Sequence, residues 1–240
     1  MERYSTIDEK YKREIVLLKA RPCKWGKCRF CDYIEDNEID EKKIDQINKK
    51  VLEKVTGKYG VLEVIDSASF FELTENTKKI IKDLANSKNI HTLFFECHWI
   101  YRKKVNEIRK YFKDQKVIIK TGVETFDNDF RENYLLKGAD FKNYKEVLQY
   151  FDSPCIMVGI KGQTREMIDR DIEIIFNNFN HATINVFNEN STDVKRDDEL
   201  VNWFLKKYHQ KLLDSEKIDY LYKITDFGVG WWKKNSEDIL

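Results

Sequence analysis

The sequence has little of what marks a disordered chain, a membrane protein or a nucleic-acid-binding protein. Its 240 residues include only two prolines and nine glycines, too few for long linkers. No run reaches the roughly 18–20 apolar residues of a membrane span, and the polar residues 1–12 are unlike a secretory signal. The 43 basic and 42 acidic residues nearly cancel, whereas proteins that grip long nucleic acids usually carry a basic excess. We therefore expect a globular, cytoplasmic protein.

The pattern along the chain is an alternation of short apolar runs with longer charged segments of helical period. Such runs are typical of parallel strands that are buried on both faces. Six successive β–α units predict a parallel sheet with right-handed crossovers, as either a partly closed barrel or an open doubly wound sheet. Strands are expected at residues 14–19, 61–66, 92–96, 117–121, 155–160 and 183–187. Helices are expected at 41–54, 75–86, 103–112, 143–151, 165–177 and 197–208.

Polar groups follow several of the expected strands. They include Asp66-Ser67-Ala68-Ser69, Glu96-Cys97-His98 and Asn188-Glu189-Asn190. The chemistry of parallel α/β folds lies at the carboxyl ends of the strands, so these groups are expected to share a rim. Polar residues also commonly begin loops, which is the simpler reading for any single strand.

Three of the five cysteines lie within nine residues of the loop at residues 21–33. Cys23, Cys28 and Cys31 have the spacing C-x4-C-x2-C. Thiolates are the usual protein ligands of iron–sulfur clusters, and a four-iron cluster normally takes four of them. Three close cysteines therefore leave one iron open. A zinc site completed by His98, or chance clustering, remain alternatives.

These residues resemble the radical S-adenosylmethionine (SAM) superfamily. The usual signature is C-x3-C-x2-C with an aromatic residue before the last cysteine, where this chain has Phe30 and one extra residue in the first gap. Residues 66–70, 120–127 and 159–164 resemble further motifs of the superfamily. The resemblance implies a single domain over residues 1–240, folded as a partial (β/α)6 barrel with a cap at 219–240. It also implies a [4Fe–4S] cluster and SAM as cofactors.

By matching positions, the resemblance gives the cluster to the three cysteines. Reductive cleavage of SAM to a 5′-deoxyadenosyl radical is the implied chemistry. The residues implied for SAM are Tyr33, Ser67, Ala68, Ser69, Glu124, Arg131 and Asn185, with Asn188 as an alternative to Asn185. For Arg131, expected at the SAM carboxylate, a solvated arginine is the simpler reading.

Within the superfamily, Ser-Ala-Ser-Phe-Phe and Phe-Glu-Cys-His resemble segments of deazaguanine-processing enzymes. The short, nearly neutral chain favours a free base over tRNA, so the expected substrate is queuine, whose cyclopentenediol side chain a lyase would cleave. A carboxylate is expected to read the base edge, an aromatic ring to stack on it, and His98 to move a proton. The candidate substrate residues are Asp66, Phe70, Glu72, Glu96, His98, Trp99, Phe187, Asn188, Glu189, Asp226 and Trp231.

Two further classes of protein stay open at this point. One is another radical SAM enzyme, acting on a different small molecule or on a deazaguanine in tRNA. The other is a non-catalytic protein, either an iron–sulfur electron carrier or a zinc-stabilised binding module. For the enzyme, an electron donor such as a flavodoxin or ferredoxin is the expected protein partner.

Overall fold

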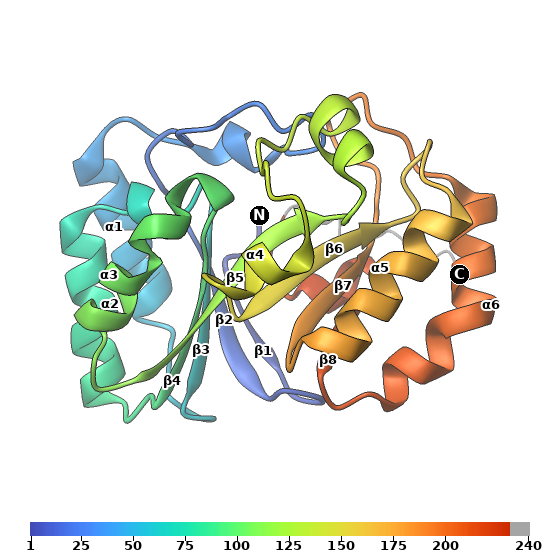
Figure 1. Ribbon diagram of the computed structural model, residues 1–240. Coiled ribbons are helices and arrows are strands. Elements are labelled where there is room, and N and C mark those ends of the chain that lie inside the picture. Colours follow the sequence, from blue (N-terminus) through green and yellow to red (C-terminus); the bar gives the residue numbers. More distant parts are fainter. Residues whose placement is uncertain (231–240) are drawn as a thin grey trace. The chain divides into compact units, whose positions relative to one another are not determined.

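The computed structural model describes residues 1–230 and divides them into two compact units (Figure 1). The first unit comprises residues 1–26, 33–119 and 227–230. The second comprises residues 27–32 and 120–226. The cysteine loop is therefore divided: Cys23 belongs to the first unit, and Cys28 and Cys31 belong to the second.

The first unit is built on four neighbouring strands with helices to one side of them (Figure 1). The first two strands are antiparallel, and the others are parallel. The strands are β1 (Tyr4–Ile7), β2 (Arg13–Leu18), β3 (Val61–Asp66) and β4 (Thr92–Glu96). The helices are α1 (Glu41–Leu52), α2 (Glu75–Ser87) and α3 (Val105–Tyr111).

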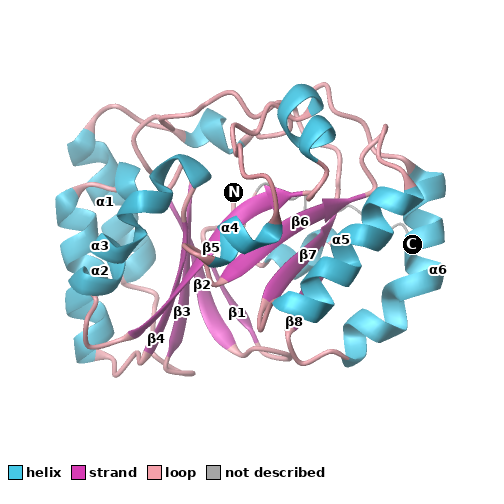
Figure 2. Cartoon of the chain, in the orientation of Figure 1, coloured by secondary structure: helices cyan, strands magenta, loops and turns pink. Residues whose placement is uncertain are grey.

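The second unit repeats the βα pattern with parallel strands (Figure 2). Its first strand enters from the other unit, since only the part of β5 from residue 120 onward belongs here. The strands are β5 (Lys116–Glu124), β6 (Ser153–Val158), β7 (Ala182–Val186) and β8 (Ile218–Leu221). The helices are α4 (Tyr144–Leu148), α5 (Arg165–Asn178) and α6 (Asp198–Asp214).

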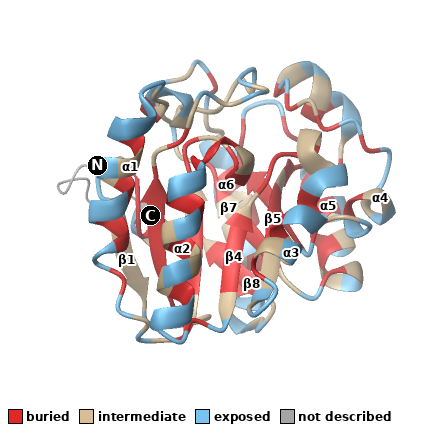
Figure 3. Cartoon of the chain, turned by 90° about the vertical axis from the view of Figure 1, so that its left-hand side faces the viewer, coloured by how far each residue is buried: buried red, intermediate tan, exposed pale blue. Residues whose placement is uncertain are grey.

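Burial explains why these residues form these elements. All six residues of β2 are buried, as expected for a strand covered on both faces. The helices α1 and α2 turn exposed residues outward and bury a stripe against the strands (Figure 3). Four of the six named helices begin at an Asp or Thr side chain that accepts a hydrogen bond from a backbone N–H in the first turn. These residues are Asp40, Thr74, Thr164 and Asp197.

The six strands and six helices expected from the sequence are all present, and their boundaries differ by three residues or fewer, except that α6 ends six residues later than expected. The strand β1 was not expected, because all four of its residues are only half-buried and lack an apolar run. The sequence also predicts a further strand at residues 220–225, and β8, which covers residues 218–221, overlaps it in part. Within residues 1–230, no helix has the length and apolar character of a transmembrane span.

A buried ion pair near the start of β2 is expected to contribute to the stability of the first unit. The Arg13 guanidinium contacts the Glu63 carboxylate on β3, and their side chains are only 4% and 2% exposed. Breaking one partner of such a pair typically costs about 3–5 kcal/mol, because the remaining charge stays buried. We expect Glu63→Gln to lower the free energy of unfolding by about 3 kcal/mol in urea denaturation.

The matched control is Asp8→Asn in the same unit. Asp8 pairs with Lys58 at 3.2 Å, and both side chains are 57% exposed. Such exposed pairs contribute about 0–1 kcal/mol. Equal losses for the two variants would show that burial of the Arg13–Glu63 pair does not matter.

Candidate functional site

The three loop cysteines differ from the other two in environment or placement. Cys23, Cys28 and Cys31 are half-exposed and form no disulfide among the described residues, whereas Cys97 is buried. Cys155 lies within β6. Burial raises the pKa of the Cys97 thiol, which disfavours the thiolate form that metals bind. The loop cysteines are therefore the thiols suited to hold a cluster.

In the second unit, the Cys28–Cys31 segment is closed by an internal hydrogen bond, and its two middle residues bond to the rest of the unit. The N–H of Cys31 donates to the carbonyl of Cys28 at 3.2 Å, and the N–H of Arg29 donates to Leu135 at 2.9 Å. Asn190 Nδ2 donates to the carbonyl of Phe30 at 2.8 Å. These bonds hold the two cysteines against the segment around residue 135, which also carries Lys137.

A buried ion pair lies beside these two thiols. Lys137 Nζ is 2.7 Å from Glu124 Oε1, and the two side chains are 9% and 7% exposed. Burial alone would lower the pKa of Lys137, but the Glu124 carboxylate and the thiols of Cys28 and Cys31 outweigh it and raise the pKa. Lys137 was not expected from the sequence, which has no periodicity or motif at this position.

Gly122 leaves the space that this pair occupies. A Cβ atom at Gly122 would press on the Glu124 carboxylate and lie 2.5 Å from Lys137 Nζ. Real Cβ atoms do not approach other atoms so closely, so a larger residue would displace the pair. The glycine thus leaves room for the present position of the pair through a close approach rather than through its backbone conformation.

Arg131, expected to pair with the SAM carboxylate, has its guanidinium bound within the protein. Its side chain is fully buried, and it donates to the backbone carbonyls of Thr125, Ala139 and Phe141 at 2.8–3.0 Å. These bonds fix the loop after β5. Lys137 is the cation that the structure places on Glu124 instead.

In the first unit, Asn37 connects the cysteine loop to the loop after β3. Its Oδ1 accepts the N–H of Cys23 at 3.1 Å, and its Nδ2 donates to the carbonyl of Ser67 at 2.8 Å. The Ser67 hydroxyl also accepts the N–H of Ala20 at 3.0 Å. Ser69 Oγ accepts the N–H of His98 at 3.1 Å. The two serines therefore use their side chains to hold these loops in place, with Ala68 between them.

Two buried carboxyl groups lie at the end of β3 and shortly after it. Burial raises the pKa of Asp66 well above its usual range, although the N–H of Ala68 opposes the shift. Burial also raises the pKa of Glu72, against the effect of the Tyr101 hydroxyl, which donates to Oε1. The N–H of Lys24 donates to the same oxygen at 3.3 Å. Glu72 Oε2 is buried and has no hydrogen-bond partner among the described residues, which leaves one acceptor open for a ligand.

His98 lies at the N-terminus of the 3₁₀-helix Trp99–Lys104. Its ring stacks on Trp25 with centroids 6.0 Å apart and planes at 19°. Nδ1 accepts the N–H of Ile100 at 3.2 Å, so the neutral ring carries its proton on Nε2. Phe70, expected to stack on the substrate, packs instead against Phe95 and Phe112 in the core.

The remaining residues of the first unit that were predicted at the site differ in burial and in contacts. Tyr33 packs against the buried cluster of Ile15, Leu17 and Val229. Glu96, half-buried at the end of β4, adds to the raised pKa of Asp66. Trp99 is buried, with Arg102 4.8 Å from its ring centroid.

In the second unit, Asn185 on β7 has a buried Oδ1 with no partner among residues 1–230. Asn188 is bound to Val186 and Arg196, and Asp226 accepts the N–H groups of Tyr222 and Lys223. Phe187 lies in a buried apolar cluster, and Glu189 is exposed and pairs with Lys195. Trp231 lies outside the described residues.

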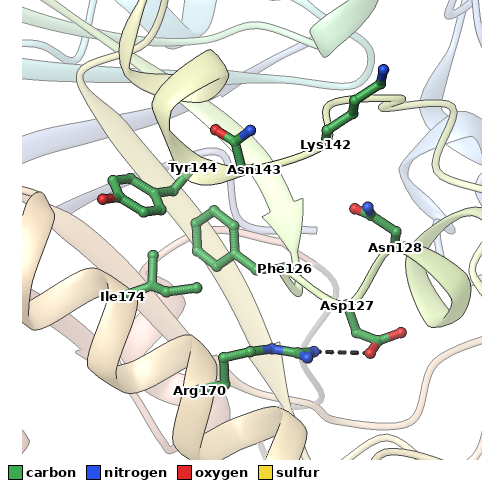
Figure 4. A pocket seen from close by; sticks show the side chains of 8 residues that line it. All are labelled: Phe126, Asp127, Asn128, Lys142, Asn143, Tyr144, Arg170 and Ile174. Atoms are coloured by element: carbon green, nitrogen blue, oxygen red, sulfur yellow. Dashed lines mark hydrogen bonds and ion pairs between the residues drawn. The ribbon is translucent and has the colours of Figure 1, made fainter.

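A separate pocket of about 310 Å³ lies between the loop that follows β5 and the helix α5 (Figure 4). None of the residues expected at the site lines it. Arg170 and Asp127 form an ion pair at its edge, 2.8 Å apart. Its lining residues are Phe126, Asp127, Asn128, Lys142, Asn143, Tyr144, Arg170 and Ile174.

The donor set fits an iron–sulfur cluster in its chemistry. The loop carries three half-exposed thiols, and a buried cation lies beside two of them, where it favours their thiolate forms. Within the described part of the chain, no group of three or more His, Cys, Asp or Glu side chains is arranged to hold a single metal ion.

Comparison with known proteins finds a close similarity to a solved structure. No family model and no curated protein matches the chain. A solved structure described as queuine lyase from Clostridium spiroforme, bound to SAM and queuine, matches with a TM-score of 0.93. The two sequences are 55% identical, and the match covers 96% of this chain and 99% of the other.

This similarity confirms the expected fold class, an α/β fold of the radical SAM type. It also confirms the resemblance that the cysteine loop and the motifs at residues 66–70 and 120–127 indicated. A chain that shares this much sequence and fold with a queuine lyase over nearly its whole length belongs to the family of radical SAM queuine lyases.

Proposed function

We propose that this chain is a lyase that uses SAM and a [4Fe–4S] cluster to remove the cyclopentenediol side chain from free queuine. The product is the aminomethyl deazaguanine base. The observation that carries this proposal is the 55% identity, over 96% of the chain, to a queuine lyase whose structure holds SAM and queuine. The electron donor, a flavodoxin or ferredoxin, and the cytoplasmic location remain predictions from the sequence.

Cys23, Cys28 and Cys31 are proposed to hold the cluster. When bound, the cluster would supply the electron for reductive cleavage of SAM, and that cleavage would provide the radical chemistry that abstracts hydrogen from the substrate. The chain itself binds, orients and shields the reactants. Its half-exposed thiols and the bonds that fasten residues 28–31 support this role.

For SAM, the Glu124–Lys137 pair offers one charge of each sign. The methionine part of SAM carries an ammonium and a carboxylate group, which a buried carboxylate and a buried ammonium complement. We propose that Glu124 faces the SAM ammonium group and that Lys137 faces the SAM carboxylate. Tyr33, the backbone of Ser67–Ser69, and Asn185 stay as further proposed SAM contacts, and the open Oδ1 of Asn185 supports its part.

For queuine, the buried groups after β3 and β4 are proposed to receive the base. Its N1–H and 2-amino groups are donors, and Glu72 Oε2 is an acceptor without a partner among the described residues. Asp66 and Glu96 remain alternative acceptors. His98 is proposed to exchange a proton through Nε2, because Nδ1 is engaged by the backbone.

The reaction is tested with anaerobically reconstituted enzyme, dithionite, SAM and queuine. Mass spectrometry is expected to find 5′-deoxyadenosine and the aminomethyl deazaguanine. A Cys28→Ala variant is expected to form neither, because it lacks a cluster ligand. Cleavage of SAM without any change in queuine would contradict the proposed substrate.

Gly122→Ala tests the role of the Glu124–Lys137 pair. The added methyl group has no room beside the two side chains, so we expect SAM affinity to fall at least about tenfold, equivalent to ~1.4 kcal/mol. Equilibrium dialysis with labelled SAM measures this, and circular dichroism checks the fold. Unchanged affinity in a folded variant would remove the pair from the SAM site.

Glu72→Gln separates the substrate from the cofactor. Losing a charged acceptor typically costs about 1.5–3 kcal/mol, so we expect the KM for queuine to rise by about 10- to 100-fold. The KM for SAM should stay within about twofold. Glu75→Gln is the control, because the Glu75 side chain is 81% exposed. A rise in the KM for SAM instead would assign Glu72 to the cofactor.

A further inference from the structure

The loop that presents Glu124 has an unfavourable backbone conformation. Glu124 has a φ of +63°, in the left-handed region that side chains other than glycine rarely adopt. The register between β5 and β6 also shifts between Gly122 and Glu124. Such a conformation costs about 1–3 kcal/mol and persists only where surrounding contacts impose it.

Two buried charged residues bind the backbone just after Glu124. From one side, Arg131 Nη1 donates to the carbonyl of Thr125 at 3.0 Å. From α5, Asp171 Oδ1 accepts the N–H of Phe126 at 2.9 Å, and its carboxyl group also accepts the Thr125 hydroxyl. Arg131 and Asp171 are 0% and 1% exposed. Burying charged groups is unfavourable unless they are well bonded. Here Arg131 binds residue 125, and Asp171 binds residues 125 and 126.

We propose that Asp171 is a positioning residue of this enzyme. It holds Thr125 and Phe126 so that Glu124 keeps its left-handed conformation and its carboxylate stays on Lys137. The inference rests on the proposed role of Glu124 and Lys137 in binding SAM. Asp171 does not contact SAM in this account and acts only through the backbone of the loop.

The charges around Asp171 give this role a pH dependence. Burial raises the pKa of Asp171 to about 7, while the bonds from Thr125 and Phe126 and the charge of Arg170 lower it. Asp127, which pairs with Arg170 beside the pocket in Figure 4, raises it, and the buried guanidinium of Arg131 also interacts with Asp171. The ionised form accepts from both donors, so SAM affinity should weaken as pH falls through about 7.

The test compares Asp171→Asn with Asp169→Asn in the reconstituted holoenzyme. Asp169 lies on the same helix, but it pairs with Lys207 and Tyr208 at 2.6 Å each. SAM affinity is measured by equilibrium dialysis between pH 6 and 8. We expect Asp171→Asn to weaken SAM binding about tenfold at pH 8 and to lose the pH dependence of the wild type. Asp169→Asn should behave as the wild type.

A second variant keeps the proposal testable if Asp171→Asn does not fold. Thr125→Val removes the hydroxyl that donates to Asp171, and we expect about a threefold loss of SAM affinity. Wild-type SAM affinity in a folded Asp171→Asn or Thr125→Val variant would overturn the proposal. The readout is independent of queuine, so failure of the substrate assignment would show separately, as normal SAM binding without queuine turnover.

Discussion

The contact between Glu124 and Lys137 is the interaction on which the proposed SAM contacts of the second unit depend. Opposite charges at 2.7 Å, nearly removed from water, are stable only when bonded to each other and held in place. The surrounding residues meet that need: Gly122 leaves the space, and Arg131 and Asp171 fasten the following loop. The pair also brings a positive charge to the thiols of Cys28 and Cys31.

In the first unit, neutral polar side chains hold the loops of the proposed site in place. Asn37 ties the backbone of Cys23 to Ser67, and Ser69 ties the backbone of His98 to the same loop. Polar side chains that follow β3 thus serve mainly to hold backbone segments. The side chains with capacity left for a ligand are fewer, and Glu72 is among them.

The sequence was sufficient to predict most strands, the helices and the cysteine loop, because buried parallel strands and closely spaced thiols are visible as patterns of residues. It was not sufficient for β1, whose half-buried residues carry no such pattern. The family resemblance implied Arg131 as a SAM contact, but tertiary packing directs its guanidinium to backbone carbonyls. The roles of Lys137 and Asn37 could not be predicted from the sequence, since only folding brings them to Glu124 and Cys23.

The central claim is that the second unit binds SAM through the buried Lys137 ammonium. The most direct measurement is the SAM affinity of reconstituted Lys137→Met, with Lys195→Met, at an exposed lysine, as the control. The account predicts at least a tenfold loss for the first, equivalent to ~1.4 kcal/mol, and none for the second. Equal affinity in both variants, with the cluster intact, would contradict it.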